Sequence, residues 1–149
     1  MNIKEELFKQ CVAYVNKRMK TVEEIISSNK KALQSETKSS AGDKHETGRA
    51  MLQLEMEKAS QQLSGIERMK ETLSKINLER TSQLAHLGNV IITDKNLYFL
   101  SISSGQHVIA NKTYFSVSVS SPIGRLLLGK KIGDFFVFNG NKQTIKEIF

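Results

Sequence analysis

The sequence predicts an α+β protein in which a long antiparallel helical hairpin precedes a small domain of β-strands with one short helix. Two observations support this prediction. Up to about residue 84 apolar residues recur every three or four positions, as in coiled coils, whereas from residue 85 onward they alternate or form short runs, as in strands. We therefore assign residues 1–84 to the hairpin and residues 85–149 to the second domain.

The first helix carries a coiled-coil seam from Phe8 to Leu33, stepping by fours and threes, with Asn29 as its polar member. A second seam runs from Leu52 through Ile76, with one shortened step. Between the seams, small and polar residues from Ser35 to Gly42 favour a turn. A loop this short makes the two helices antiparallel, so the hairpin has its tip near residues 36–46.

The second domain is predicted to contain five strands and a helix. The helix spans Ile123 to Leu128, because Ser121 can cap it, Pro122 suits its first turn and Gly129 can end it. Asn139-Gly140 is a tight-turn signal, so the last two strands should form an antiparallel hairpin. The predicted strands are Val90–Thr93, Leu97–Ile102, Tyr114–Val119, Asp134–Phe138 and Gln143–Phe149.

Charge, cysteine content and the lengths of apolar runs limit the classes of protein to which this chain can belong. The formal net charge of +7 is compatible with an acidic protein partner or a nucleic acid. Cys11 is the single cysteine and cannot form an internal disulfide, which favours the cytoplasm. No apolar run approaches the roughly 20 residues of a membrane span, so we expect no membrane anchor. No Ser/His/Asp set, glycine-rich phosphate loop or Cys/His pair supports a self-contained enzyme.

The tip carries two carboxylates, Asp43 and Glu46, where the second helix begins. As a capping box, Asp43 would be the N-cap and Glu46 the reciprocal third residue of the helix. The same spacing puts both carboxylates on one edge of the first turn, where their oxygens could share Mg²⁺ with another macromolecule. Both interpretations remain open from the residues alone. We assign no role to His45, since an exposed loop histidine is commonly just solvated.

Basic residues gather at the same end of the hairpin. They would neutralise phosphates of a nucleic acid, or simply form a solvated polar face. These residues are Lys30, Lys31, Lys38, Lys44 and Arg49.

The segment Ser121-Pro122-Ile123-Gly124-Arg125-Leu126-Leu127-Leu128-Gly129-Lys130-Lys131-Ile132-Gly133-Asp134 closely resembles the C-terminal signature of the GreA/GreB transcript cleavage factors. The tip, Gly42-Asp43-Lys44-His45-Glu46, resembles the Gly-Asp-x-x-Glu of that family. The resemblance implies an FKBP-like, antiparallel second domain that docks on RNA polymerase at the rim of its secondary channel.

The resemblance also implies roles for individual residues. Asp43 and Glu46 would help hold a Mg²⁺ ion of the polymerase active centre, and the polymerase itself would hydrolyse backtracked RNA. The protein would thus be an accessory factor, expected to act as a monomer. Docking would involve Ser121, Pro122, Ile123 and Arg125. Contacts with nascent RNA are expected from the basic charge at the tip, not from the resemblance, and would involve Lys38, Lys44 and Arg49.

The chain departs from the family pattern after Glu46, where Thr47-Gly48-Arg49-Ala50 replaces the usual Asn-Ala-Glu-Tyr. The aromatic residue and a third acid are missing, and the stretch from Val90 to Ser121 is shorter than usual, so a strand or loop there should be reduced. These departures favour one alternative to a cleavage factor, a non-cleaving regulator that occludes the channel. Two further alternatives are an FKBP-like prolyl isomerase, suggested by the implied FKBP-like domain, and a structural coiled-coil oligomer, suggested by the helical periodicity.

Overall fold

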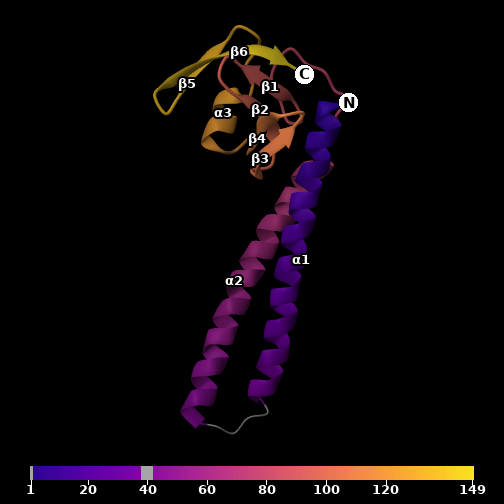
Figure 1. The fold of residues 1–149 in the computed structure, drawn as a ribbon. Coiled ribbons are helices and arrows are strands. Elements are labelled where there is room, and N and C mark those ends of the chain that lie inside the picture. Colours follow the sequence, from indigo (N-terminus) through magenta and orange to yellow (C-terminus); the bar gives the residue numbers. More distant parts are fainter. Residues whose placement is uncertain (1, 38–41) are drawn as a thin grey trace. The chain divides into compact units, whose positions relative to one another are not determined.

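The computed structural model describes the backbone of residues 2–37 and 42–149 and the side chains of residues 2–35 and 46–149. Two long helices, α1 (Ile3–Thr37) and α2 (Gly42–Ser74), precede a six-stranded sheet and a short helix, α3 (Pro122–Leu127), as Figure 1 shows. The predicted fold class is therefore confirmed. The chain divides into two compact units: Val15–Lys70, and Met1–Tyr14 together with Glu71–Phe149. The second unit thus includes the first turns of α1, whereas the sequence analysis divided the chain after residue 84.

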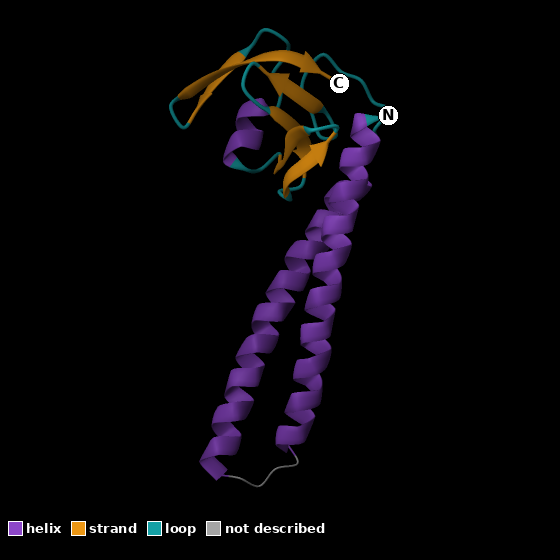
Figure 2. Ribbon diagram, in the orientation of Figure 1, coloured by secondary structure: helices purple, strands orange, loops and turns teal. Residues whose placement is uncertain are grey.

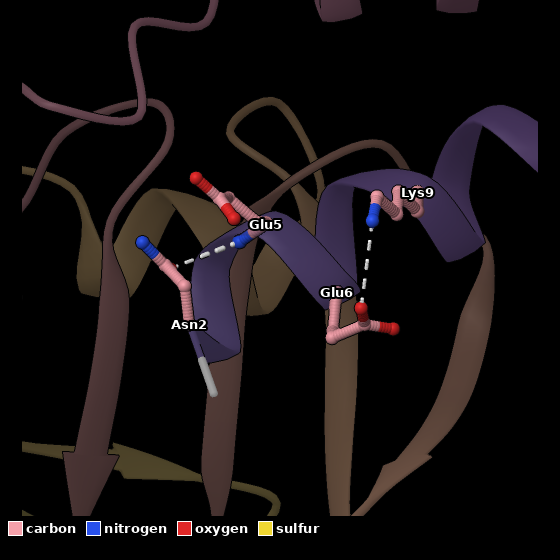
Figure 3. Close-up of polar contacts among 4 residues, drawn as sticks. All are labelled: Asn2, Glu5, Glu6 and Lys9. Atoms are coloured by element: carbon pink, nitrogen blue, oxygen red, sulfur yellow. Dashed lines mark hydrogen bonds and ion pairs between the residues drawn. The ribbon is translucent and has the colours of Figure 1, made fainter.

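Helix α1 begins with a local cap. Asn2 Oδ1 accepts a hydrogen bond from the backbone N–H of Glu5 at 3.2 Å, which satisfies one of the free donors of the first turn (Figure 3). Glu5 and Glu6 add negative charge where the helix dipole favours it. Lys9 Nζ lies 3.7 Å from Glu6 Oε1, but the pair is too exposed to add much stability. No Gly or Pro interrupts the 35 residues of α1, so the helix can continue to Thr37.

The unit of residues 15–70 is a helical hairpin built on the predicted seams (Figure 2). From α1, Val15, Val22 and Asn29 are buried, and from α2, Ala59 and Ile66. These positions recur every seven residues, the sum of one expected step of three and one of four, because only that stripe of each helix can face the other. The helix ends differ slightly from the prediction. Helix α1 extends into the predicted turn, and α2 ends at Ser74, before Ile76.

The sheet has the strand order β3-β4-β2-β1-β6-β5. Its strands are β1 (Val90–Thr93), β2 (Leu97–Ser101), β3 (Gly105–Ile109), β4 (Lys112–Ser118), β5 (Phe135–Phe138) and β6 (Asn141–Ile148). The expectation of an antiparallel sheet needs one correction, because β2 and β4 pair in parallel and the sheet is mixed. The cause is β3, which was not predicted. It forms a hairpin with β4 and so returns the chain alongside β2 in the same direction.

Each face of the sheet is covered over part of its area within this unit. On one face, α3 contributes Ile123 and Leu127 to a core that also contains Ala85, Ile91, Tyr98, Leu100, Phe136 and Ile145. The other face is covered by the start of α1, where Leu7 and Cys11 are fully buried. Cys11 Sγ lies 3.5 Å from Ser116 Oγ, which belongs to β4. The first turns of α1 therefore belong to the packed core of the sheet.

Candidate functional site

The two carboxylates of the predicted site belong to the first turn of α2. The helix begins at Gly42, so Asp43 lies inside the helix and does not precede it as an N-cap residue would. Glu46 is exposed, whereas the side chain of Asp43 lies outside the described residues. Residues three apart on a helix project from the same edge, so the helical backbone is compatible with a shared ligand for Asp43 and Glu46.

The residues that distinguish this tip from the family pattern follow in the same helix. Thr47 and Arg49 are exposed, and Gly48 is half-buried. Among the other basic residues of this end, Lys30 and Lys31 are exposed. Lys38 and the side chain of Lys44 lie outside the described residues, so their proposed contacts with nucleic acid stay predictions.

The two carboxylates at the tip are ligands of the type that Mg²⁺ prefers, but they are too few to complete its coordination shell. Carboxylate oxygens are the ligands that Mg²⁺ prefers, yet two of them leave most of an octahedral shell to water or to a partner. Among the residues with described side chains, no group of three His, Cys, Asp or Glu is placed to hold a metal ion. A shared Mg²⁺ at Asp43 and Glu46 would need further oxygen ligands from another source, and the site stays a prediction.

The start of α3 forms the second part of the predicted site. Ser121 is the N-cap: its Oγ accepts a hydrogen bond from Gly124 N at 3.1 Å and donates one to Ser118 O at 2.6 Å. Pro122 occupies the first turn, as predicted. Pro122 and Arg125 are exposed and available to a partner, whereas Ile123 is only 8% exposed and packs in the core. Only part of the predicted docking set therefore lies on the surface.

A cavity of about 280 Å³ lies beside α3, on its face of the sheet. Three aromatic side chains contribute to its lining: Tyr98 of β2, Phe115 of β4 and Phe138 of β5. Asn96, Val117, Ile123, Asn139, Asn141 and Gln143 complete the lining. Its lining is mostly apolar with a few amides, as in ligand pockets, and its volume lies just below the usual range for such pockets.

Gln143 organises the polar part of this cavity. Its side chain is 3% exposed, and its Oε1 accepts hydrogen bonds from Tyr98 OH at 2.9 Å and from Thr93 Oγ1 at 3.0 Å. Asn96 Nδ2 donates to Tyr98 OH at 3.2 Å. These bonds hold the tyrosine ring against the cavity. The sequence analysis missed this cluster, since a glutamine inside an alternating strand carries no signal of its own.

A further polar network joins α1 to the sheet and was also missed. Ser104 Oγ lies 2.7 Å from His107 Nε2, and His107 Nδ1 lies 3.1 Å from Gln10 Oε1. Because Gln10 Oε1 can only accept, Nδ1 carries the proton and Nε2 accepts from Ser104. Burial lowers the pKa of the His107 imidazole below its usual 6.5. The network therefore holds a neutral histidine between helix and sheet.

Among the described residues, no helix is both long enough and apolar enough to cross a membrane. No protein-family model matches the chain, and no curated protein sequence matches it. Among solved structures, the transcription factor Gfh1 is similar at a TM-score of 0.32 and 15% sequence identity, over 93% of this chain and 89% of that chain. Similarity at this level does not establish a shared family.

Proposed function

We propose that this chain is a Gre-like accessory factor of RNA polymerase that stimulates the cleavage of backtracked RNA. The proposal starts from the residue resemblances at Gly42–Glu46 and Ser121–Asp134. The observation that carries it is the start of α2, where Asp43 and Glu46 stand in the first turn of a helix at the end of the hairpin. A hairpin that presents two acids at its end suits delivery of carboxylates to a site on another macromolecule.

The chain's own residues would act in two places. Pro122 and Arg125, exposed at α3, would dock the protein on the polymerase, while Ser121 holds the start of α3 in shape. Asp43 and Glu46 would offer oxygen ligands beside the scissile phosphate of the nascent RNA. Bound there, Mg²⁺ supplies the Lewis acid for hydrolysis and the activation of water. Arg49, exposed on the same helix, would neutralise an RNA phosphate.

The test of cleavage is a stalled, backtracked elongation complex incubated with the full chain and Mg²⁺, with the length of the nascent RNA as the readout. Replacing both acids, Asp43→Asn and Glu46→Gln, should abolish the shortening of RNA and spare polymerase binding. The amides keep the size of the side chains but lose the charge that Mg²⁺ requires. If the two acids only stabilise the helix, the double variant will lose thermal stability and cleave normally.

Docking is tested separately with Arg125→Glu in the full chain. Lys112→Glu is the matched control, because Lys112 is also exposed and the charge change is the same. Polymerase pull-down should fail for Arg125→Glu and succeed for the control. Equal binding by both variants would show that the surface at α3 is not the docking site.

A non-cleaving regulator of the same channel is the nearest alternative, and Thr47-Gly48-Arg49-Ala50 is the feature that favours it. Wild-type protein that binds polymerase without shortening backtracked RNA would establish that alternative. The aromatic cavity beside α3 favours a second candidate, a prolyl isomerase, since it is lined by Tyr98, Phe115 and Phe138. An isomerase assay on a proline peptide, with Phe115→Ala as the cavity variant, would decide that question.

A further inference from the structure

Strand β5 is a free edge of the six-stranded sheet. It pairs with β6 through a two-residue turn, Asn139-Gly140, whose φ values of 51° and 78° are those of a type I′ turn. In such a hairpin the residues that close the turn, Phe138 and Asn141, exchange hydrogen bonds, and the pairs then alternate. The backbone N–H and C=O groups of Phe135 and Val137 consequently point away from β6.

The side chains of the same two residues are also uncovered. Phe136 and Phe138 of β5 turn inward, whereas Phe135 and Val137 face the opposite side and are 57% and 55% exposed. Ile132, in the turn that leads into β5, is 60% exposed. An exposed apolar edge strand is a ready template for a further strand, and proteins usually protect such an edge.

The opposite edge of the sheet is strand β3, and α1 contacts its outward backbone. Strand β3 has one exposed apolar side chain, Val108. By the same alternation the carbonyl of Val108 points outward, and there it accepts a hydrogen bond from Gln10 Nε2 of α1 at 3.3 Å. No corresponding partner for the outward backbone groups of Phe135 and Val137 is found among the described residues. The β5 edge differs from the β3 edge in two ways: none of its outward backbone groups has a partner among the described residues, and its two outward-facing residues are both exposed and apolar.

The charges around the β5 edge indicate what kind of strand could pair with it. Lys131, Lys142 and Lys146 are exposed around this edge. Lys142 pairs with Val137 across the hairpin, and its Nζ lies 4.4 Å from the centroid of the Phe135 ring. Asp134, the acid that precedes Phe135 in the sequence, already accepts a hydrogen bond from the backbone N–H of Lys131 at 2.9 Å. A second copy of β5 would bring like charges together, whereas an acidic strand would be attracted.

We infer that the β5 edge binds an extended, acidic segment of a partner protein, which adds to the sheet as a seventh strand. Backbone hydrogen bonds to Phe135 and Val137 would provide most of the affinity. Apolar side chains at alternate positions of the segment would cover Phe135 and Val137, and carboxylates at its two ends, on the same face of the strand, would meet Lys142 and Lys131. The inference does not depend on polymerase binding, and the free full-length protein is sufficient to test it.

The probe is a fluorescein-labelled peptide, Glu-Thr-Val-Thr-Ile-Thr-Glu, in which the Glu, Val and Ile side chains share one face of the strand. Its binding is followed by fluorescence anisotropy at low salt. Wild-type protein should bind it saturably, and the Phe135 and Val137 amides should become protected from hydrogen exchange. Val137→Pro removes one outward N–H and leaves the bonds to β6 intact, so it should weaken binding at least tenfold without unfolding the protein. Lys142→Glu should weaken binding similarly, and Leu84→Ser, at a residue 50% exposed elsewhere, should have no effect.

Controls separate strand pairing from adhesion to an apolar patch. The same peptide N-methylated at every second residue in either phase, or with Lys in place of Glu, should not bind. The inference is wrong if wild-type protein shows no saturable binding, if a control peptide binds as well, or if Val137→Pro binds normally. A wild-type dimer that Val137→Pro converts to a monomer would identify a second copy as the occupant instead. Should Val137→Pro fail to fold, the double variant Phe135→Thr and Val137→Thr gives the same test through the side chains.

Discussion

The glycine in α3 offers the sharpest test of how the second domain is built. Gly124 is buried, and its N–H donates to the Ser121 cap. A Cβ at this position would overlap the carbonyl oxygen of Ser118 and lie 2.8 Å from the carbonyl carbon. That carbonyl cannot easily move, because it accepts hydrogen bonds from both Ser121 N at 3.1 Å and Ser121 Oγ at 2.6 Å. Gly124→Ala must therefore displace α3 or break its cap.

The expected cost has two parts. Loss of the N-cap hydrogen bond costs about 1 kcal/mol, and overpacking a core site costs a further 1–3 kcal/mol or so. For a domain of about the size of the sheet unit, each kcal/mol lowers the melting temperature by roughly 4–8 °C, so a cost of about 2–4 kcal/mol gives an expected fall of roughly 8–30 °C. Near-UV circular dichroism of the full chain is the measurement, since Tyr98 and Tyr114 are both buried in the sheet unit.

Gly65→Ala is the matched control. Gly65 lies inside α2, and an added Cβ there would meet only the Arg68 side chain, at 3.7 Å. Alanine in a helix interior should stabilise the protein by roughly 0.5–1 kcal/mol. The reasoning is refuted if Gly124→Ala melts within about 3 °C of the wild type, or if it changes stability no more than Gly65→Ala does.

Three further predictions concern the rest of the chain. Asn29 is 7% exposed, and its Nδ2 has no hydrogen-bond partner among the described residues, so Asn29→Leu should raise the free energy of unfolding by about 1–2 kcal/mol in chemical denaturation. Because the pKa of His107 is lowered in the fold, the unfolded chain takes up its proton first. Stability should hence fall as the pH drops below 6.5 and level off below the folded pKa, and His107→Gln should flatten this dependence in thermal melts. Polymerase affinity should weaken as salt rises, given the net charge of +7, and a titration with no salt dependence would leave the basic excess without a role in binding.

Local patterns in the sequence were sufficient to predict most of the helices and strands. The seams of α1 and α2 could be predicted because only one stripe of each helix is buried, so Val22 and Ile66 occur at the regular spacing of the other seam residues. The cap at Ser121 and the turn at Asn139-Gly140 could be predicted because each is determined by residues close in sequence. These features require no knowledge of long-range contacts.

The tertiary structure decided what depends on distant contacts. Strand β3, with polar Gln106 and His107, has no clean alternation, and only its pairing with β4 makes it a strand and β2–β4 a parallel pair. In the sequence Cys11 is only the single cysteine, and it is the fold of the sheet that places Ser116 beside it. Similarly, Ile123 was expected at a docking surface, but packing against the sheet buries it, because side-chain exposure is set by neighbours that lie far away along the chain.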